Sequence, residues 1–157
     1  MSRRKRVYTK PEQRDARYDS ALVAKLVSKV MMQGKRALAE RIVYAAIDRA
    51  NEGGESVDPT EVLNRAIENA KPRVEVKSRR VGGATYQVPL EVNQDRQESL
   101  AMRWIVNAAR SKRGTPMHVA LANEIKDAST NQGQVIRKRD ETHKMAQANR
   151  AFAHFRW

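Results

Sequence analysis

Apolar and polar residues alternate clearly in one stretch of the chain, from residue 72 to residue 92. The alternation runs over Val74–Lys77 and again over Tyr86–Val92, with Gly82–Gly83 between the two runs. Glycine accepts the positive φ angle that a tight turn between strands needs. The pattern therefore predicts a β-hairpin arm at 73–92. Its base must pack on another element, because an isolated hairpin is only marginally stable in water.

The register of this hairpin depends on the length of its loop. A two-residue turn would place Val76 opposite Pro89 and would mix apolar and polar side chains on each face. An odd-length loop of residues 81–83, or a bulge, would place Val76 opposite Val88 and keep the apolar side chains together. A slip of one residue moves every side chain to the other face, so the pattern favours the odd-length loop. The tip of the arm is basic and carries Lys77, Arg79 and Arg80.

Most other apolar residues recur every three or four positions, which is typical of amphipathic helices. The predicted helices begin at Asp19 or Ser20, at Lys35, at Asp58, at residue 96, at Thr115 and near Val135. Asp58 and Thr115 each precede a proline, a frequent arrangement at helix starts. We expect Met31 and Met32 to complete the apolar face of the first helix. We expect Leu38 to point inward on the second.

The last predicted helix, at 135–150, has few apolar residues and many cations, so it needs docking or an outside partner to be stable. The chain then ends in aromatic residues mixed with charge, over 151–157. These rings could stack on single-stranded RNA or could pin the terminus to the fold, and both interpretations stay open. Trp104 lies within an apolar stripe, which favours a core position over stacking on a base.

Lysine and arginine together number 31 against 18 acidic residues, which gives a net charge of +13. Such an excess opposes compaction and indicates a polyanionic partner, first nucleic acid and second an acidic membrane surface. The absence of cysteine excludes disulfides and thiolate metal sites. No apolar run approaches the roughly 20 residues of a membrane span, and no secretory signal is recognisable. An intracellular protein is therefore expected.

The N-terminal extension, residues 1–18, contains seven cations against two carboxylates. Since almost nothing in it could be buried, we expect it to be disordered until it binds an anion. A solvated tail or a nuclear import signal are alternatives.

No motif for catalysis is present. There is no phosphate-binding loop of the Walker type, and the three histidines lack the spacing of a metal site. The sequence therefore predicts neither an enzyme nor a metal, cofactor or small-molecule substrate.

Three segments together are highly specific. They read V-E-V-K-S-R-R-V-G-G-A-T-Y-Q-V-P at 74–89, A-M-R-W-I-V at 101–106 and A-F-A-H-F-R-W at 151–157. They closely resemble the bacterial small-subunit ribosomal protein seven family, and the resemblance covers essentially the whole chain. It implies a mainly α fold, a six-helix domain at 19–157 with the extended β-hairpin arm between helices three and four.

The same resemblance implies primary binding to the 3′ major domain of 16S ribosomal RNA, which nucleates assembly of the 30S head. It also implies a place at the subunit interface beside the exit-site transfer RNA and the messenger RNA path, with head and platform ribosomal proteins as neighbours. In this interpretation no membrane and no cofactor are involved. The rival hypotheses are a basic helical DNA-binding or mRNA-binding regulator and a membrane-surface protein.

The candidate contacts are basic residues in five segments, the final Trp157 and the tip of the hairpin. For ribosomal RNA they are Arg3, Arg4, Lys5, Arg6, Lys10, Lys35, Arg36, Arg110, Lys112, Arg113, Arg137, Lys138, Arg139, Arg150, Arg156 and Trp157. For transfer and messenger RNA they are Lys77, Arg79, Arg80, Val81, Gly82, Gly83 and Ala84.

Overall fold

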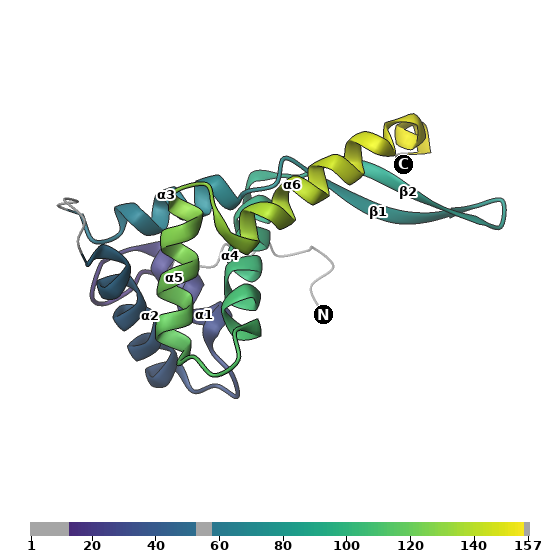
Figure 1. Ribbon diagram of the computed structural model, residues 1–157. Coiled ribbons are helices and arrows are strands. Elements are labelled where there is room, and N and C mark those ends of the chain that lie inside the picture. Colours follow the sequence, from purple (N-terminus) through teal and green to yellow (C-terminus); the bar gives the residue numbers. More distant parts are fainter. Residues whose placement is uncertain (1–12, 53–57, 156–157) are drawn as a thin grey trace, which may run out of the picture.

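The computed structural model describes residues 13–52 and 58–155. In this part of the chain, six α-helices and one short 3-10 helix accompany a single antiparallel hairpin (Figure 1). The elements are α1 (Ala21–Val30), α2 (Arg36–Asn51), α3 (Glu61–Ala70), β1 (Val74–Val81), β2 (Ala84–Glu91), α4 (Gln94–Ser111), α5 (Met117–Ser129), α6 (Gly133–Ala148) and η1 (Arg150–Phe155). The predicted mainly α fold, with a hairpin between the third and fourth helices, is confirmed. The disorder predicted for residues 1–18 concerns mostly residues outside the described ranges, which begin at residue 13.

Helix α5 lies at the centre of the helical body and packs against α2, α3 and α4. Its Leu121 and Ile125 are fully buried and belong to the same core as Val43, Ile67 and Ile105 of these neighbours. Many other buried positions are alanines, whose small side chains let the helix backbones approach closely. The apolar periodicity of five helices thus converges on one core.

The predicted helix starts are largely confirmed. The Ser20 hydroxyl accepts a hydrogen bond of 3.4 Å from the backbone N–H of Val23 and caps α1. Helix α2 begins at Arg36, directly after Lys35. The Asp58 carboxylate accepts hydrogen bonds of 2.8 Å and 2.9 Å from the backbone N–H and the hydroxyl of Thr60. It therefore organises the turn before α3, whose N-cap is Thr60 rather than Asp58.

Two predicted core positions are wrong. Met32 is 64% exposed and Leu38 is 45% exposed. Helix α1 ends at Val30, and the left-handed backbone at Gln33 and Gly34 then turns the chain, so Met32 lies outside the helical face. On α2 the inward position is taken by Ala39, which is 3% exposed.

The predicted odd-length loop of the hairpin is also wrong. Val81 pairs with Ala84 across a two-residue turn in which Gly82 has φ 58° and Gly83 has φ 88°. Positive φ at both turn residues matches the twist of the strands and favours this short turn. The register consequently places Val76 opposite Pro89 and Lys77 opposite Val88.

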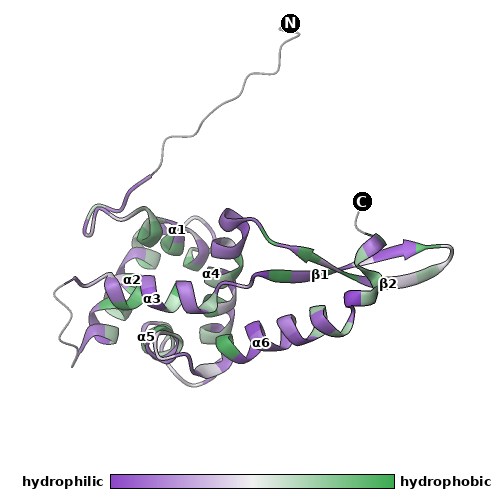
Figure 2. Ribbon diagram, turned by 90° about the horizontal axis from the view of Figure 1, so that it is seen from above, coloured by the Kyte–Doolittle hydropathy of each residue, from purple (hydrophilic) through white to green (hydrophobic). Residues whose placement is uncertain are grey.

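Helix α6 and η1 run beside the hairpin as it projects from the helical body (Figure 1). Beyond its first turns α6 is mostly hydrophilic (Figure 2). The Tyr86 ring lies 5.1 Å, between centroids, from both Phe152 and Phe155 of η1. At the base of the hairpin, the Arg96 guanidinium contacts both carboxylate oxygens of Glu75. Phe152 and Phe155 thus pin the end of the chain to the hairpin, whereas Trp157 lies outside the described residues.

The chain enters α1 through a buried polar contact. Asp15 is 3% exposed, so the expectation that almost nothing in residues 1–18 is buried is wrong at this position. Its carboxylate accepts hydrogen bonds from the Tyr44 hydroxyl at 2.6 Å and from the backbone N–H groups of Arg17 and Tyr18. Sequence patterns missed it because the decisive partner, Tyr44, lies on α2.

Candidate nucleic-acid interface

The basic residues predicted to bind RNA divide into two groups. In the first group the side chain is held by a carboxylate or a backbone carbonyl of the fold. In the second the side chain is exposed and, within residues 13–52 and 58–155, makes no ion pair; this group contains Lys35, Arg80, Arg113, Arg137, Lys138 and Arg150. Only the second group is free to neutralise phosphates without first giving up a partner.

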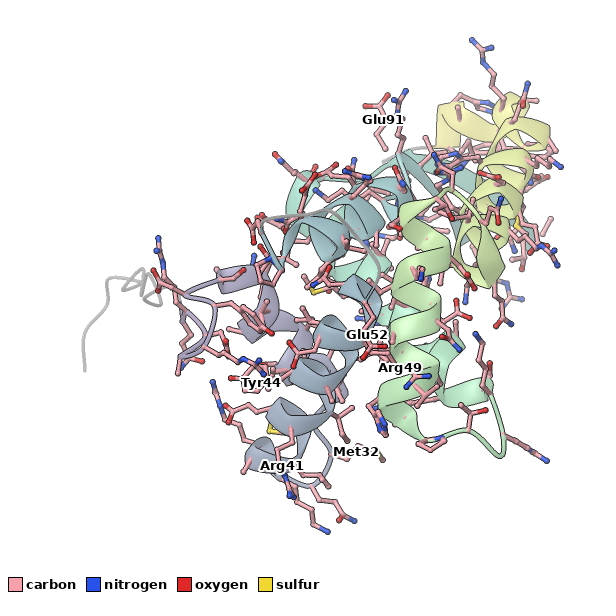
Figure 3. The ribbon with its side chains drawn as sticks, turned by 60° about the vertical axis from the view of Figure 1, so that its left-hand side comes forward. Met32, Arg41, Tyr44, Arg49, Glu52 and Glu91 are labelled. Atoms are coloured by element: carbon pink, nitrogen blue, oxygen red, sulfur yellow. The ribbon has the colours of Figure 1, made fainter. Side chains whose placement is uncertain are left out.

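The fold brings two of the predicted basic segments together. Lys35, before α2, and Arg110, near the end of α4, line one hollow of about 450 Å³. Its other lining residues are mainly apolar: Val30, Met32, Gln33, Leu38, Ala39, Ile42 and Met117. Figure 3 shows Met32 and Arg41 at the same end of the helical body. We call this feature the body hollow.

At this end of the helical body, the side chains of Arg36 and Arg110 are held by hydrogen bonds within the fold. The Arg36 Nε lies 2.7 Å from Glu40 Oε1, and this hydrogen bond raises the pKa of Arg36. The Nη2 of Arg110 donates to the carbonyl of Val30 at 3.2 Å and that of Lys29 at 3.4 Å. Arg110 therefore satisfies carbonyls at the C-terminal end of α1. Its planar guanidinium is held in place at the wall of the body hollow.

Lys112 pairs with a buried carboxylate. Its Nζ lies 2.7 Å from Oε1 of Glu124, whose side chain is only 2% exposed. Within the described part of the chain, Oε2 of Glu124 has no hydrogen-bond partner. A buried carboxylate without its cation lowers the stability of the fold, so the main role of Lys112 is to neutralise Glu124. The next residue, Arg113, is exposed in the connector between α4 and α5.

The basic run at the start of α6 also divides. Arg139 donates through Nη1 to the carbonyl of Asn69, and its Nη2 lies 2.7 Å from Asp140, so it ties α6 to α3. The Lys138 ammonium lies 5.6 Å from the centroid of the Trp104 ring. Arg137 is exposed. Trp104 itself is partly buried and packs against the core, as its apolar stripe predicts.

Cations at the hairpin differ in the same way. Lys77 Nζ lies 3.4 Å from Glu75, and Arg79 is partly buried opposite Tyr86. Arg80 is exposed beside the turn, with Gly82, Gly83 and Ala84 exposed around it and Val81 partly covered. Arg150, at the start of η1, lines a hollow of about 440 Å³ between α6 and the base of the hairpin.

Sequence reasoning missed both uncovered apolar side chains of the body hollow and the exposed Arg41 at the same end of the helical body. No other cation is adjacent to Arg41 in the sequence, so no cluster of charge marks it. Met32 and Leu38 fit a helical pattern and could be identified as exposed only from the tertiary structure.

Some predicted contacts lie outside the described residues. They are Arg3, Arg4, Lys5, Arg6, Lys10, Arg156 and Trp157. Within the described ranges, no group of three or more metal-ligating side chains comes together. The same ranges contain no helix that is long and apolar enough to span a membrane.

The comparisons with known proteins decide the family. The profile described as "Ribosomal protein S7p/S5e" matches residues 2–150. The chain belongs to this family. The protein named "Small ribosomal subunit protein uS7" of Akkermansia muciniphila is 78% identical over 157 residues, covering 100% of both chains. Proteins of the same name from Desulfotalea psychrophila and Mycolicibacterium smegmatis are 50% identical over 100% and 55% identical over 94% of both chains.

The resemblance inferred from three short segments is therefore confirmed over nearly the full chain. Members of this family are structural ribosomal proteins and not enzymes, so the expectation that the chain is not an enzyme is confirmed by its relatives.

Proposed function

We propose that this structural constituent of the small subunit of the cytoplasmic ribosome binds the 3′ major domain of 16S ribosomal RNA directly. The observation that carries the proposal is the body hollow, where exposed Lys35 and the guanidinium of Arg110 border uncovered Met32 and Leu38. Cations beside uncovered apolar side chains suit RNA, which offers phosphates and the flat faces of unstacked bases.

Binding would proceed mainly by release of counterions from the RNA. Each lysine or arginine that neutralises a phosphate adds to the salt dependence of the affinity. The helical core holds Lys35, Arg113 and Arg137 on separate elements at fixed positions, so a folded RNA junction of matching shape binds them together. Specificity then comes from shape and from a few unstacked bases. As a primary binder, the protein would nucleate assembly of the 30S head.

The hairpin would contact RNAs other than the 3′ major domain. Its exposed tip, with Arg80 and Gly82–Gly83, projects away from the helical body, which suits contact with the exit-site transfer RNA and the messenger RNA path. Head and platform ribosomal proteins would be its neighbours. No observation favours a DNA-binding or mRNA-binding regulator, so duplex DNA and unrelated RNA serve as competitors in the test.

The test is a salt titration of binding to the 3′ major domain of 16S RNA, with duplex DNA and an unrelated folded RNA as competitors. We expect tight, competitor-resistant binding and a slope of log affinity against log salt of about −0.7 to −0.9 for each phosphate neutralised. Equal affinity for all three polyanions would show that charge alone acts and would contradict the proposal.

Two double variants with the same loss of charge sharpen this test. Lys35→Ala/Arg113→Ala removes two exposed cations beside the body hollow and the α4–α5 connector, and should make the salt slope about two phosphates shallower. Arg49→Ala/Lys126→Ala removes two exposed cations from the last turns of α2 and α5, which, like Lys35 and Arg113, make no ion pair within the described residues. This control should bind with nearly the wild-type slope.

A further inference from the structure

A third, smaller hollow lies where the start of α6 crosses the C-terminal half of α4. It measures about 210 Å³ and is lined by Trp104, Asn107, Ala108, Ser111, Gln134, Val135 and Lys138. It shares no lining residue with the body hollow. We call it the tryptophan hollow.

Its walls combine an aromatic ring, two amides, a hydroxyl and a cation. The Trp104 indole is partly exposed, and Asn107, Gln134 and Lys138 are exposed on neighbouring turns. The Ser111 hydroxyl donates to the carbonyl of Ala108 at 2.7 Å and lies 3.5 Å from Oε1 of Gln134. No carboxylate is among the lining residues. Arg103 and Arg137 are exposed next in sequence to Trp104 and Lys138, so the surroundings are also positive.

Trp104 differs from the other large rings of the described chain in what lies beside it. Tyr18 contacts Tyr44, and Tyr86 contacts both Phe152 and Phe155, so these rings cover one another. Trp104 instead has the Lys138 ammonium at 5.6 Å from its centroid. A lysine side chain is flexible and can move its ammonium from a ring to a phosphate.

From this arrangement we propose that the tryptophan hollow binds one unpaired nucleotide of RNA. Its base stacks on the Trp104 indole, and its phosphate is bound by Lys138. The amides of Asn107 and Gln134 each offer both a donor and an acceptor, which suits the hydrogen-bonding edge of a base. This inference rests on the proposed RNA binding and assigns a particular base-reading site to it.

An acidic peptide of a neighbouring protein is the competing occupant. It fits less well, because the hollow is small and most of its exposed lining is amide, hydroxyl and ring. A peptide anchor prefers a deeper apolar pocket. Charge complementarity is shared by both occupants, whereas the ring with two amides favours a base.

Fluorescence offers a direct test. The chain has two tryptophans, so the Trp157→Phe variant leaves Trp104 as the only indole. The affinity of this variant for the 3′ major domain is measured first and serves as the reference. Binding should then quench the Trp104 emission, and the RNA concentration at half-quenching should match the affinity measured by filter binding.

Variants in the same background test the amides and the cation. Asn107→Ala/Gln134→Ala should lose roughly tenfold in affinity with an unchanged salt slope, since it removes base contacts only. Lys138→Ala should weaken binding and make the slope shallower by about one phosphate. Lys144→Ala is the matched control, because Lys144 is an exposed cation further along α6 and outside the hollow. This variant should show the same quenching of Trp104 and nearly the same affinity for the 3′ major domain as the reference.

The outcomes separate this inference from the proposed function. If the reference protein shows no preference for the 3′ major domain, the proposed function fails and this site with it. If binding is tight but the Trp104 emission stays unchanged and Asn107→Ala/Gln134→Ala binds like the reference, only the tryptophan hollow is overturned. Quenching by a small-subunit protein and not by RNA would also overturn it, in favour of the peptide.

Discussion

The hydroxyl of Tyr44, in the middle of α2, donates a hydrogen bond of 2.6 Å to the buried carboxylate of Asp15, which precedes α1. Around this contact, Arg17 lies over the rings of Tyr18 and Tyr44 and pairs with Asp48 at 3.1 Å. The contact fixes the point where the N-terminal extension joins the helical body. It raises the pKa of Tyr44 to about 12.

We expect Tyr44→Phe to lower the free energy of unfolding by about 1–3 kcal/mol, because it removes a hydrogen bond to a buried charge and leaves that oxygen unpaired. Urea unfolding followed by circular dichroism measures the change. Tyr18→Phe is the control, since its hydroxyl donates to the exposed Asp48 and its loss should cost less. Equal losses in the two variants would contradict the special weight given to Asp15.

The same contact predicts a loss of stability in acid. Burial by itself raises the pKa of Asp15, but the hydrogen bonds from Tyr44, Tyr18 and Arg17 outweigh burial and lower the pKa overall. A lowered pKa in the folded state means that the unfolded chain binds protons more readily. The contribution is present above the ordinary pKa of aspartate, about 3.9. It is lost as the pH falls through the lowered value.

Unfolding free energies measured from pH 7 down to pH 2 should therefore fall more steeply for the wild type than for Asp15→Asn. The asparagine variant begins less stable but lacks this proton linkage. Parallel curves for the two proteins would rule out Asp15 as a source of the acid sensitivity.

For the Lys112–Glu124 pair, we expect that removing one charge destabilises the fold more than removing both. Lys112→Met leaves a carboxylate that is 2% exposed without its cation and should cost about 3 kcal/mol, near the low end for a broken buried pair because the lysine is 34% exposed. Lys112→Met/Glu124→Leu removes both charges and should restore most of the loss. Thermal unfolding of the two variants and the wild type gives the comparison. A double variant less stable than Lys112→Met would contradict the argument.

The turn at Gly82–Gly83 predicts a sharp preference among substitutions. Both residues have positive φ, and a Cβ at either position meets no atom within 4 Å, so the cost of substitution is backbone strain and not crowding. Gly82→Ala should cost about 1–2 kcal/mol in the local stability of the hairpin. Gly82→Asn should cost less, because asparagine tolerates this conformation. Hydrogen exchange of the strand amides measures both, and equal protection in the two variants would argue against a two-residue turn.

Local patterns were sufficient where a residue acts within its own helix. The cap at Ser20 and the apolar stripe of α4 follow from neighbours three or four positions away. Leu38 could not be assigned in this way, because it and Ala39 both fit a helical stripe and only the packing of α5 decides between them.

The candidate site shows the same limit. Clusters of charge identified the basic segments, but not which cations the fold already uses. Lys112 and Glu124 lie on different elements, as do Arg139 and Asn69, and sequence spacing says nothing of such pairs. The hairpin register failed for a related reason: one covered face was assumed, whereas the twist of a two-residue glycine turn fixed the pairing.

The contacts that hold the hairpin against α4 and η1 have a mechanical consequence. Arg96 grips Glu75 close to the helical body, and Phe152 and Phe155 hold Tyr86 farther out. Helix α6 also packs against both strands, so the strand ends beyond Tyr86 are the part of the hairpin that projects farthest from its contacts. A force on the turn at Gly82–Gly83 is transmitted to α4 through the Glu75–Arg96 contact and to η1 through the contacts of Tyr86. Ending the chain before Phe152 would remove the ring contacts of Tyr86 and make the outer part of the hairpin more flexible.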